Sequence, residues 1–269
     1  MSVHVRPVMG IVRAVVIVLC VGVCVAAAVT PAQAVVNGDV VPGGNYNDPI
    51  PATNEYAFVG RVASSTDGLC TASLVSPDYI LTAGHCNDGG RLTITFGMLN
   101  KDRDRSATFA QNRTVVETQL FHDSLRDGQD LLLGKLDSPV FGIAPIRMPD
   151  PARDANMWSS NSRLTLAGWG SIGSVNTAEL RIATLKVADD AVSLPPWTGL
   201  MKLNHVQGYG AGGDSGGPVF GRSADGYPIL VGVYEAAIGP GHMYANRVWI
   251  ETPLIEYLNS VQYVATPSP

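Results

Sequence analysis

Short apolar runs recur along the chain and are separated by clusters of glycine, proline, aspartate and asparagine. Runs of this length that are rich in β-branched and aromatic residues are typical of strands, and the polar clusters are typical of turns. The pattern therefore predicts an all-β fold. The runs expected to be strands are Leu92–Phe96, Thr114–Leu120, Leu164–Ala167, Thr184–Val187 and Ile229–Tyr234.

A different spacing near the C-terminus predicts one helix, from about Pro253 to Gln262. Thr252 can cap it, and proline is well suited to the first turn of a helix. Leu254, Leu258 and Val261 share one face at helical spacing.

The N-terminal apolar run indicates export. Arg6 and Arg13 precede the uncharged run Ala14–Val29, which is followed by small residues ending at Ala34. A basic start, an apolar middle and an Ala-x-Ala end are typical of a secretory signal peptide. The alternative is a retained membrane anchor, but the run is short for a bilayer span. We expect residues 1–34 to be removed, which leaves a mature chain of residues 35–269.

Ser215 is the candidate nucleophile, within the segment Gly212–Pro218 (Gly-Gly-Asp-Ser-Gly-Gly-Pro). Glycine reaches backbone angles that are closed to other residues, so a tight loop can direct N–H groups toward one point beside the serine. Acyl transfer requires a nucleophile next to such donors.

Two further segments offer partners for this serine. His85 lies in Thr82–Cys86 (Thr-Ala-Gly-His-Cys), directly after an apolar run. Asp130 heads the apolar triplet Leu131–Leu133.

In this order the three segments resemble the catalytic motifs of the secreted trypsin/chymotrypsin-like serine protease family. The resemblance runs from about Val35 to about Val261. Two other segments support it: Cys70–Leu74 resembles the family's Cys-x-x-Ser-Leu strand, and Ala167–Gly170 contains its Gly-Trp-Gly.

The resemblance implies a fold of two six-stranded antiparallel β-barrels, with the active site between them and a C-terminal helix. Residues 35–269 would then form one protease domain. Several prolines crowd residues 140–160. We therefore place the N-terminal barrel at about 35–145 and the C-terminal barrel at about 146–262.

The resemblance also implies catalytic roles. Ser215 would be the nucleophile and His85 its general base, because a serine hydroxyl needs a base and imidazole titrates near neutral pH. Asp130 would orient the imidazole. The backbone N–H groups of Gly213 and Ser215 would form the oxyanion hole.

Asp214 has a separate expected role. In the family, the acid before the nucleophile pairs with the free amino group of the mature N-terminus. Here Val35-Val36-Asn37-Gly38 follows Ala34 directly and resembles the family's mature start. Our hypothesis is that signal peptidase itself creates the activating amine on Val35, so that the enzyme is active on export.

The expected substrate pocket departs from the family. Tyr209 stands where a pocket-floor residue is expected, followed by Gly210, and brings no charge for a basic side chain. Glu235, Ala236 and Ala237 replace the family's Ser-Trp-Gly. Three interpretations of Glu235 remain open: a second carboxylate near the triad acid that raises local pKa values, a negative charge inside the pocket, or a solvated acid on a strand edge.

Cysteine usage predicts one disulfide in the mature chain. Cys20 and Cys24 lie in the signal peptide, so only Cys70 and Cys86 remain. A pair in an exported protein indicates a disulfide, here beside the candidate base.

The charge of the chain argues against nucleic acid as a partner. The formal net charge is −5, and removal of a segment with two arginines and no acids changes it to −7. We expect a secreted, extracellular monomer that acts on polypeptides, with no membrane contact after signal cleavage. We expect no cofactor and no metal cluster, although the sequence leaves a loop calcium site open.

The leading function is a secreted serine endopeptidase that works through an acyl-enzyme. One alternative is a catalytically weak, protease-like binding protein, prompted by Tyr209 and by Glu235–Ala237. The other is an esterase, which would use the same acyl chemistry on an easier bond.

Overall fold

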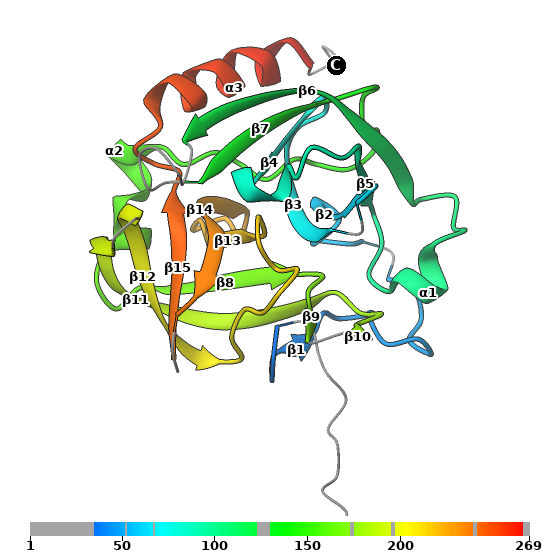
Figure 1. The fold of residues 1–269 in the computed structure, drawn as a ribbon, viewed down its shortest axis with the longest axis horizontal. Helices are drawn as coiled ribbons and strands as arrows, with labels where there is room; N and C mark the ends of the chain where they lie inside the picture. Colours follow the sequence, from blue (N-terminus) through cyan, green and yellow to red (C-terminus); the bar gives the residue numbers. More distant parts are fainter. Residues whose placement is uncertain are drawn as a thin grey trace, which may run out of the picture. The chain divides into compact units, whose positions relative to one another are not determined.

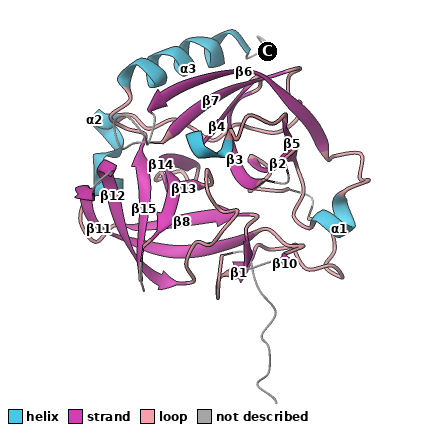
Figure 2. Cartoon of the chain, viewed as in Figure 1, coloured by secondary structure: helices cyan, strands magenta, loops and turns pink. Residues whose placement is uncertain are grey.

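The computed structural model describes residues 35–265 apart from positions 52, 67, 123–129, 173–174, 195–196 and 239–240. The predicted signal segment lies outside the described residues. Strands make up most of the regular secondary structure among the described residues, and helices are few (Figure 2). The predicted all-β class is confirmed.

Six strands form a first closed antiparallel barrel in the order β2-β3-β4-β7-β6-β5. Val62 on β2 lies opposite Ile94 on β5, and this pairing closes the barrel. The strands are β2 (Val59–Ser64), β3 (Leu69–Ser76), β4 (Tyr79–Thr82), β5 (Leu92–Phe96), β6 (Gln111–His122) and β7 (Leu131–Leu136).

A second group of six antiparallel strands follows in the order β11-β12-β15-β14-β13-β8, and a further pairing of β11 with β8 closes it. Strand β1 (Asp39–Val40) adds to β11, and β9 (Ser171–Ile172) pairs with β10 (Val175–Asn176). The predicted pair of six-stranded barrels is confirmed (Figure 1). The barrel strands are β8 (Arg163–Gly168), β11 (Arg181–Leu194), β12 (Trp197–Gln207), β13 (Pro218–Arg222), β14 (Pro228–Ala237) and β15 (His242–Arg247).

The chain crosses between the barrels over residues 137–162, because β7 ends at Leu136 and β8 begins at Arg163. The expected boundary near residue 145 lies in this segment. The short helices are η1 (Gly84–Cys86), α1 (Lys101–Asp104), α2 (Pro151–Asp154) and η2 (Ala155–Trp158).

The C-terminal helix α3 (Thr252–Ala265) contains the predicted helix and extends beyond it. Leu254 and Leu258 are fully buried, as their spacing predicts, whereas the side chain of Val261 lies outside the described residues. The Tyr257 ring packs edge-on against Tyr79 of β4 at 5.6 Å, which anchors α3 to the first barrel. Among the described helices, none is long and apolar enough to cross a membrane.

The two barrels pack against each other through large buried side chains. Trp169, which directly follows β8, is fully buried and donates its indole N–H to the carbonyl of Val59 at 3.2 Å. Phe58 and Phe220 meet edge to face at 5.8 Å. Segments from both barrels that are distant in sequence are thereby held together.

Candidate active site

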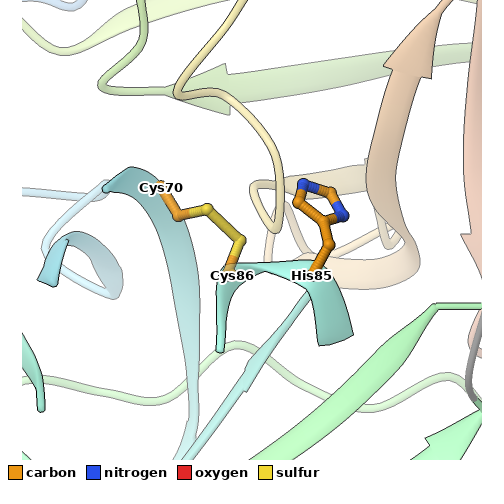
Figure 3. A group of neighbouring side chains, drawn as sticks. All are labelled: Cys70, His85 and Cys86. Atoms are coloured by element: carbon orange, nitrogen blue, oxygen red, sulfur yellow. A yellow bond between two sulfur atoms is a disulfide. The ribbon is translucent and has the colours of Figure 1, made fainter. Parts of the chain in front are cut away.

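His85 is held on η1 by covalent and hydrogen bonds. The predicted disulfide joins Cys70 on β3 to Cys86 on η1, and the imidazole stands beside it on the same turn (Figure 3). The His85 side chain remains 42% exposed, so a reactant can reach the ring.

Asp130, directly before β7, binds His85 at two points. One carboxylate oxygen accepts the backbone N–H of His85 at 2.8 Å. The other contacts Nδ1 of the imidazole. This arrangement orients the ring and leaves Nε2 for chemistry.

Asn246 on β15 fixes the main chain of Asp130 from the second barrel. Its side-chain oxygen accepts the Asp130 N–H at 2.9 Å, and its side-chain nitrogen donates to the Asp130 carbonyl at 2.8 Å. Sequence reasoning missed this residue, since no motif marks it and its role depends on the register that places Asn246 opposite Val233.

Glu235 on β14 belongs to the same buried group. Its carboxyl group contacts that of Asp130, and one oxygen lies 3.9 Å from Nδ1 of His85. The other oxygen accepts a hydrogen bond from the Asn246 side chain at 3.0 Å. Glu235 is only 7% exposed. Of the three interpretations left open by the sequence, this position matches the carboxylate beside the triad acid.

The pKa values of this group diverge. Burial, the charge of Asp130 and a hydrogen bond with Asp130 raise the pKa of Glu235 to about 8. Burial would also raise the pKa of Asp130, but hydrogen bonds with His85 and Glu235 outweigh it and hold that pKa below its usual value. Burial lowers the pKa of His85, yet the hydrogen bond and charge of Asp130 outweigh it and leave the pKa raised.

Ser215 lies in a loop that the first barrel holds in place. Its carbonyl accepts the N–H of Thr71, on β3, at 2.8 Å. Its hydroxyl donates to the carbonyl of Glu235 at 3.4 Å, and among the described residues no hydrogen bond joins it to the His85 ring. Catalytic hydrogen bonds often tighten only when substrate binds.

Gly213 has the backbone conformation that the expected oxyanion hole requires. Its φ of +88° lies in the left-handed region that favours glycine. The Thr71 hydroxyl donates to the Gly213 carbonyl at 2.9 Å, which fixes the peptide group that follows Gly213. Between described residues, the N–H groups of Gly213 and Ser215 donate to no protein acceptor, so both can serve an incoming oxygen.

Asp214 is completely buried behind this loop. Its carboxylate accepts the N–H groups of Ala211 at 2.8 Å, Gly170 at 2.9 Å and Val35 at 3.1 Å. Burial raises the pKa of Asp214 to about 6, although these three N–H groups act in the opposite direction. Val35 and Asp214, 179 positions apart, are thus brought together.

The space beside Gly210 is filled by side chains of the protein itself. A Cβ atom added to Gly210 would lie 2.3 Å from Cζ of Tyr234, and Met243 accepts the Gly210 N–H on its sulfur at 3.3 Å. Tyr234 is 1% exposed and Met243 fully buried. By contrast, the predicted floor residue Tyr209 is 39% exposed.

Sequence reasoning missed Tyr234 and Met243. No local pattern marks Tyr234, because β14 is a continuous buried run rather than an alternating one. Ala236 is partly buried and Ala237 is exposed, at the end of β14.

Two groups of described side chains have the composition of a metal site. In one, the ligand atoms of His85, Asp130 and Glu235 lie within 4.8 Å of one another. The hydrogen bonds among them already satisfy these atoms, as described above. In the other, the sulfurs of Cys70 and Cys86 lie within 4.8 Å of a ring nitrogen of His85, but both are committed to the disulfide.

Comparison with known proteins identifies relatives of the chain. The family model described as Trypsin matches residues 49–259. Snake venom serine protease catroxase-2 of Crotalus atrox is 28% identical over 183 residues, which cover 62% of this chain and 68% of that protein. A protein C activator of Agkistrodon piscivorus leucostoma is 31% identical over 183 residues, with the same coverage of both chains.

A solved structure of HBP at atomic resolution aligns with a TM-score of 0.65 and covers 87% of this chain and 99% of that chain. Its sequence identity is 19%, so this similarity concerns the fold alone.

Proposed function

The chain belongs to the trypsin family and is a serine-type endopeptidase, and we propose that Ser215, His85 and Asp130 are its catalytic triad. The observation that carries the proposal is the double contact of the buried Asp130 carboxylate with the His85 backbone and ring. That contact leaves Nε2 of His85 as the nitrogen that can take a proton from Ser215.

In this mechanism, Oγ of Ser215 attacks the carbonyl carbon of the cleaved bond while its proton passes to His85. The carbonyl oxygen gains a negative charge and accepts the N–H groups of Gly213 and Ser215. The C–N bond then breaks, and the leaving amine takes the proton from His85. Water, activated by the same imidazole, hydrolyses the resulting ester and releases Ser215.

We also propose that a free amino group on Val35 completes the site. As an ammonium group, it would neutralise the buried carboxylate of Asp214, which accepts hydrogen bonds from backbone N–H groups of the described residues. Because Ala34 ends the predicted signal peptide, its cleavage would generate this group without a separate activation step. Secretion, a monomeric state and the absence of nucleic-acid or membrane partners in the mature protein belong to the same proposal.

We further propose that the enzyme cleaves after small residues. The family's primary pocket is expected between the loop that contains Gly210 and the edge of β14. Tyr234 and Met243 occupy the space beside Gly210, so that a large substrate side chain would meet filled volume. Glycine or alanine before the cleaved bond requires little depth.

Labelling with a fluorophosphonate probe tests the catalytic proposal. The secreted protein should be labelled at Ser215, and the Ser215→Ala and His85→Ala variants should be folded but unlabelled. Equal labelling of the Ser215→Ala variant would refute the assigned nucleophile. N-terminal sequencing of the active protein tests the start at Val35.

A cleavage-site profile on a denatured protein digest tests the substrate preference. Cuts should cluster after Gly, Ala and similarly small residues. Frequent cuts after Arg, Lys or Phe would contradict a filled pocket. The less favoured alternative of a protein that binds without catalysis predicts no labelling and no cuts.

A further inference from the structure

We propose that Glu235 is a positioning residue of the triad: its protonated carboxyl group donates a hydrogen bond to Asp130 and holds that carboxylate against the His85 ring. The inference rests on the triad proposed above. It gives a role to an acid that the general acyl-transfer mechanism does not use.

The first argument is charge. Glu235 and Asp130 are both less than a tenth exposed, and their carboxyl oxygens lie within 4.8 Å of each other. Among described residues, no lysine or arginine forms an ion pair with either one. Two carboxylates this close in a buried site do not both ionise, so one of them carries a proton.

The hydrogen-bond donors decide which carboxyl group keeps the proton. Asp130 accepts both the backbone N–H and the ring of His85, and such bonds favour the ionised form. Among described residues, the Glu235 carboxyl group receives one N–H, from the side chain of Asn246. The proton therefore resides on Glu235, in agreement with the opposite directions of the two pKa shifts.

Protonation gives each carboxyl oxygen of Glu235 and Asp130 a hydrogen-bond partner. The Glu235 hydroxyl donates to Asp130, the other Glu235 oxygen accepts from Asn246, and Asn246 in turn fixes the Asp130 main chain. The triad acid is thus held from three directions, and one negative charge faces the imidazole.

Ionisation of Glu235 would remove this support. The charged and titratable groups that face it are Asp130, His85 and, from the adjacent position on β14, Tyr234. Burial and the nearby Asp214 and Glu235 carboxyls raise the pKa of Tyr234, so the phenol stays neutral. As the pH rises through the folded-state pKa of Glu235, about 8, the donor is lost and two carboxylates repel each other beside His85.

The test compares Glu235→Gln with Glu235→Ala. Glutamine has the same shape, donates through its amide and does not titrate, so it imitates the protonated acid. We would measure kcat and KM on a peptide ester with alanine at the cleavage site, from about pH 5 to about pH 10. Fluorophosphonate titration would give the concentration of active enzyme, and thermal unfolding would confirm the fold.

The wild type should lose kcat/KM above about pH 8, in step with the ionisation of Glu235. Glu235→Gln should keep kcat/KM at neutral pH within about threefold and lack that loss. Any remaining decline of kcat/KM at higher pH comes from deprotonation of the Val35 amine, which contacts Asp214 and not Glu235. Glu235→Ala should lower kcat about 10- to 100-fold with little change in KM, because it leaves buried partners unsatisfied.

An unchanged alkaline decline in Glu235→Gln would overturn the inference. Equal losses in the glutamine and alanine variants at neutral pH would also overturn it, since they would show that the donated hydrogen bond is unimportant. If wild-type Ser215 is not labelled at all, the proposed function fails, and the inference fails with it. The glutamine variant alone decides the question if the alanine variant does not fold.

Discussion

Opening the space beside Gly210 should change the substrate preference of the enzyme. The perturbation is Tyr234→Val, which replaces a fully buried ring with a shorter side chain suited to a strand. A phenylalanine side chain of the substrate could then occupy the vacated volume next to Gly210. The strand itself should be retained, because backbone pairing of Tyr234 with Ala245 does not involve the ring.

The magnitude follows from the size of the ring. Full burial of a phenylalanine side chain stabilises by about 1.5–3 kcal/mol, and each 1.4 kcal/mol is about a factor of ten. The kcat/KM ratio of phenylalanine to alanine substrates should therefore rise by about 10- to 100-fold. The cost of the cavity without substrate is about 3 kcal/mol of unfolding free energy.

Matched peptide substrates that differ only in the residue before the cleaved bond provide the assay. Tyr234→Phe is the control, because it removes the hydroxyl but keeps the ring. Its ratio of kcat/KM for phenylalanine over alanine substrates should equal that of the wild type. The reasoning is refuted if Tyr234→Val is folded and labelled by a fluorophosphonate, yet its ratio stays within about twofold of the wild type.

Three further outcomes are expected. A protein that retains Ala34 ahead of Val35 should lose at least about 100-fold in kcat/KM, since the buried Asp214 then lacks its cation; an unimpaired rate would exclude the activation proposal. Replacing Cys70 and Cys86 together by serine should cost about 3 kcal/mol, because the disulfide closes a short loop with a sequence separation of 16. Calorimetry should show a melting temperature lower by about 6–12 °C, and a change under about 2 °C would contradict this. Asn246→Leu should lower kcat more than it raises KM, since it removes both hydrogen bonds to the Asp130 main chain; equal effects on the two constants would argue against positioning.

The strands and the disulfide could be predicted because their signals are local, whereas the arrangement of the strands in two barrels followed from the family resemblance. Leu92–Phe96 has the same bounds as β5, and the cysteine pair remained once the signal peptide was set aside. The roles assigned to His85, Asp130 and Ser215 stay predictions that labelling and mutagenesis can test.

The remainder of the site depends on contacts between distant strands. The register of β14 against β15 brings Asn246 beside Glu235 and Asp130. The sequence left three interpretations of Glu235 open: a pocket acid, a solvated acid or a neighbour of the triad. The direction of its side chain depends on where the strand lies in the closed barrel. Tyr234 and Met243 were missed for the same reason: nothing local shows which side chains converge on Gly210.

The pairing of Asp130 with Asn246 also bears on how the enzyme fails under stress. Asp130 directly precedes β7 of the first barrel, while Asn246 lies on β15 of the second, and two hydrogen bonds of 2.9 and 2.8 Å connect them. A slight separation of the barrels would break both bonds and misplace the triad acid while each barrel still keeps its own closed sheet. Inactivation by heat or denaturant should therefore precede the loss of secondary structure, and activity should report on barrel docking rather than on global unfolding.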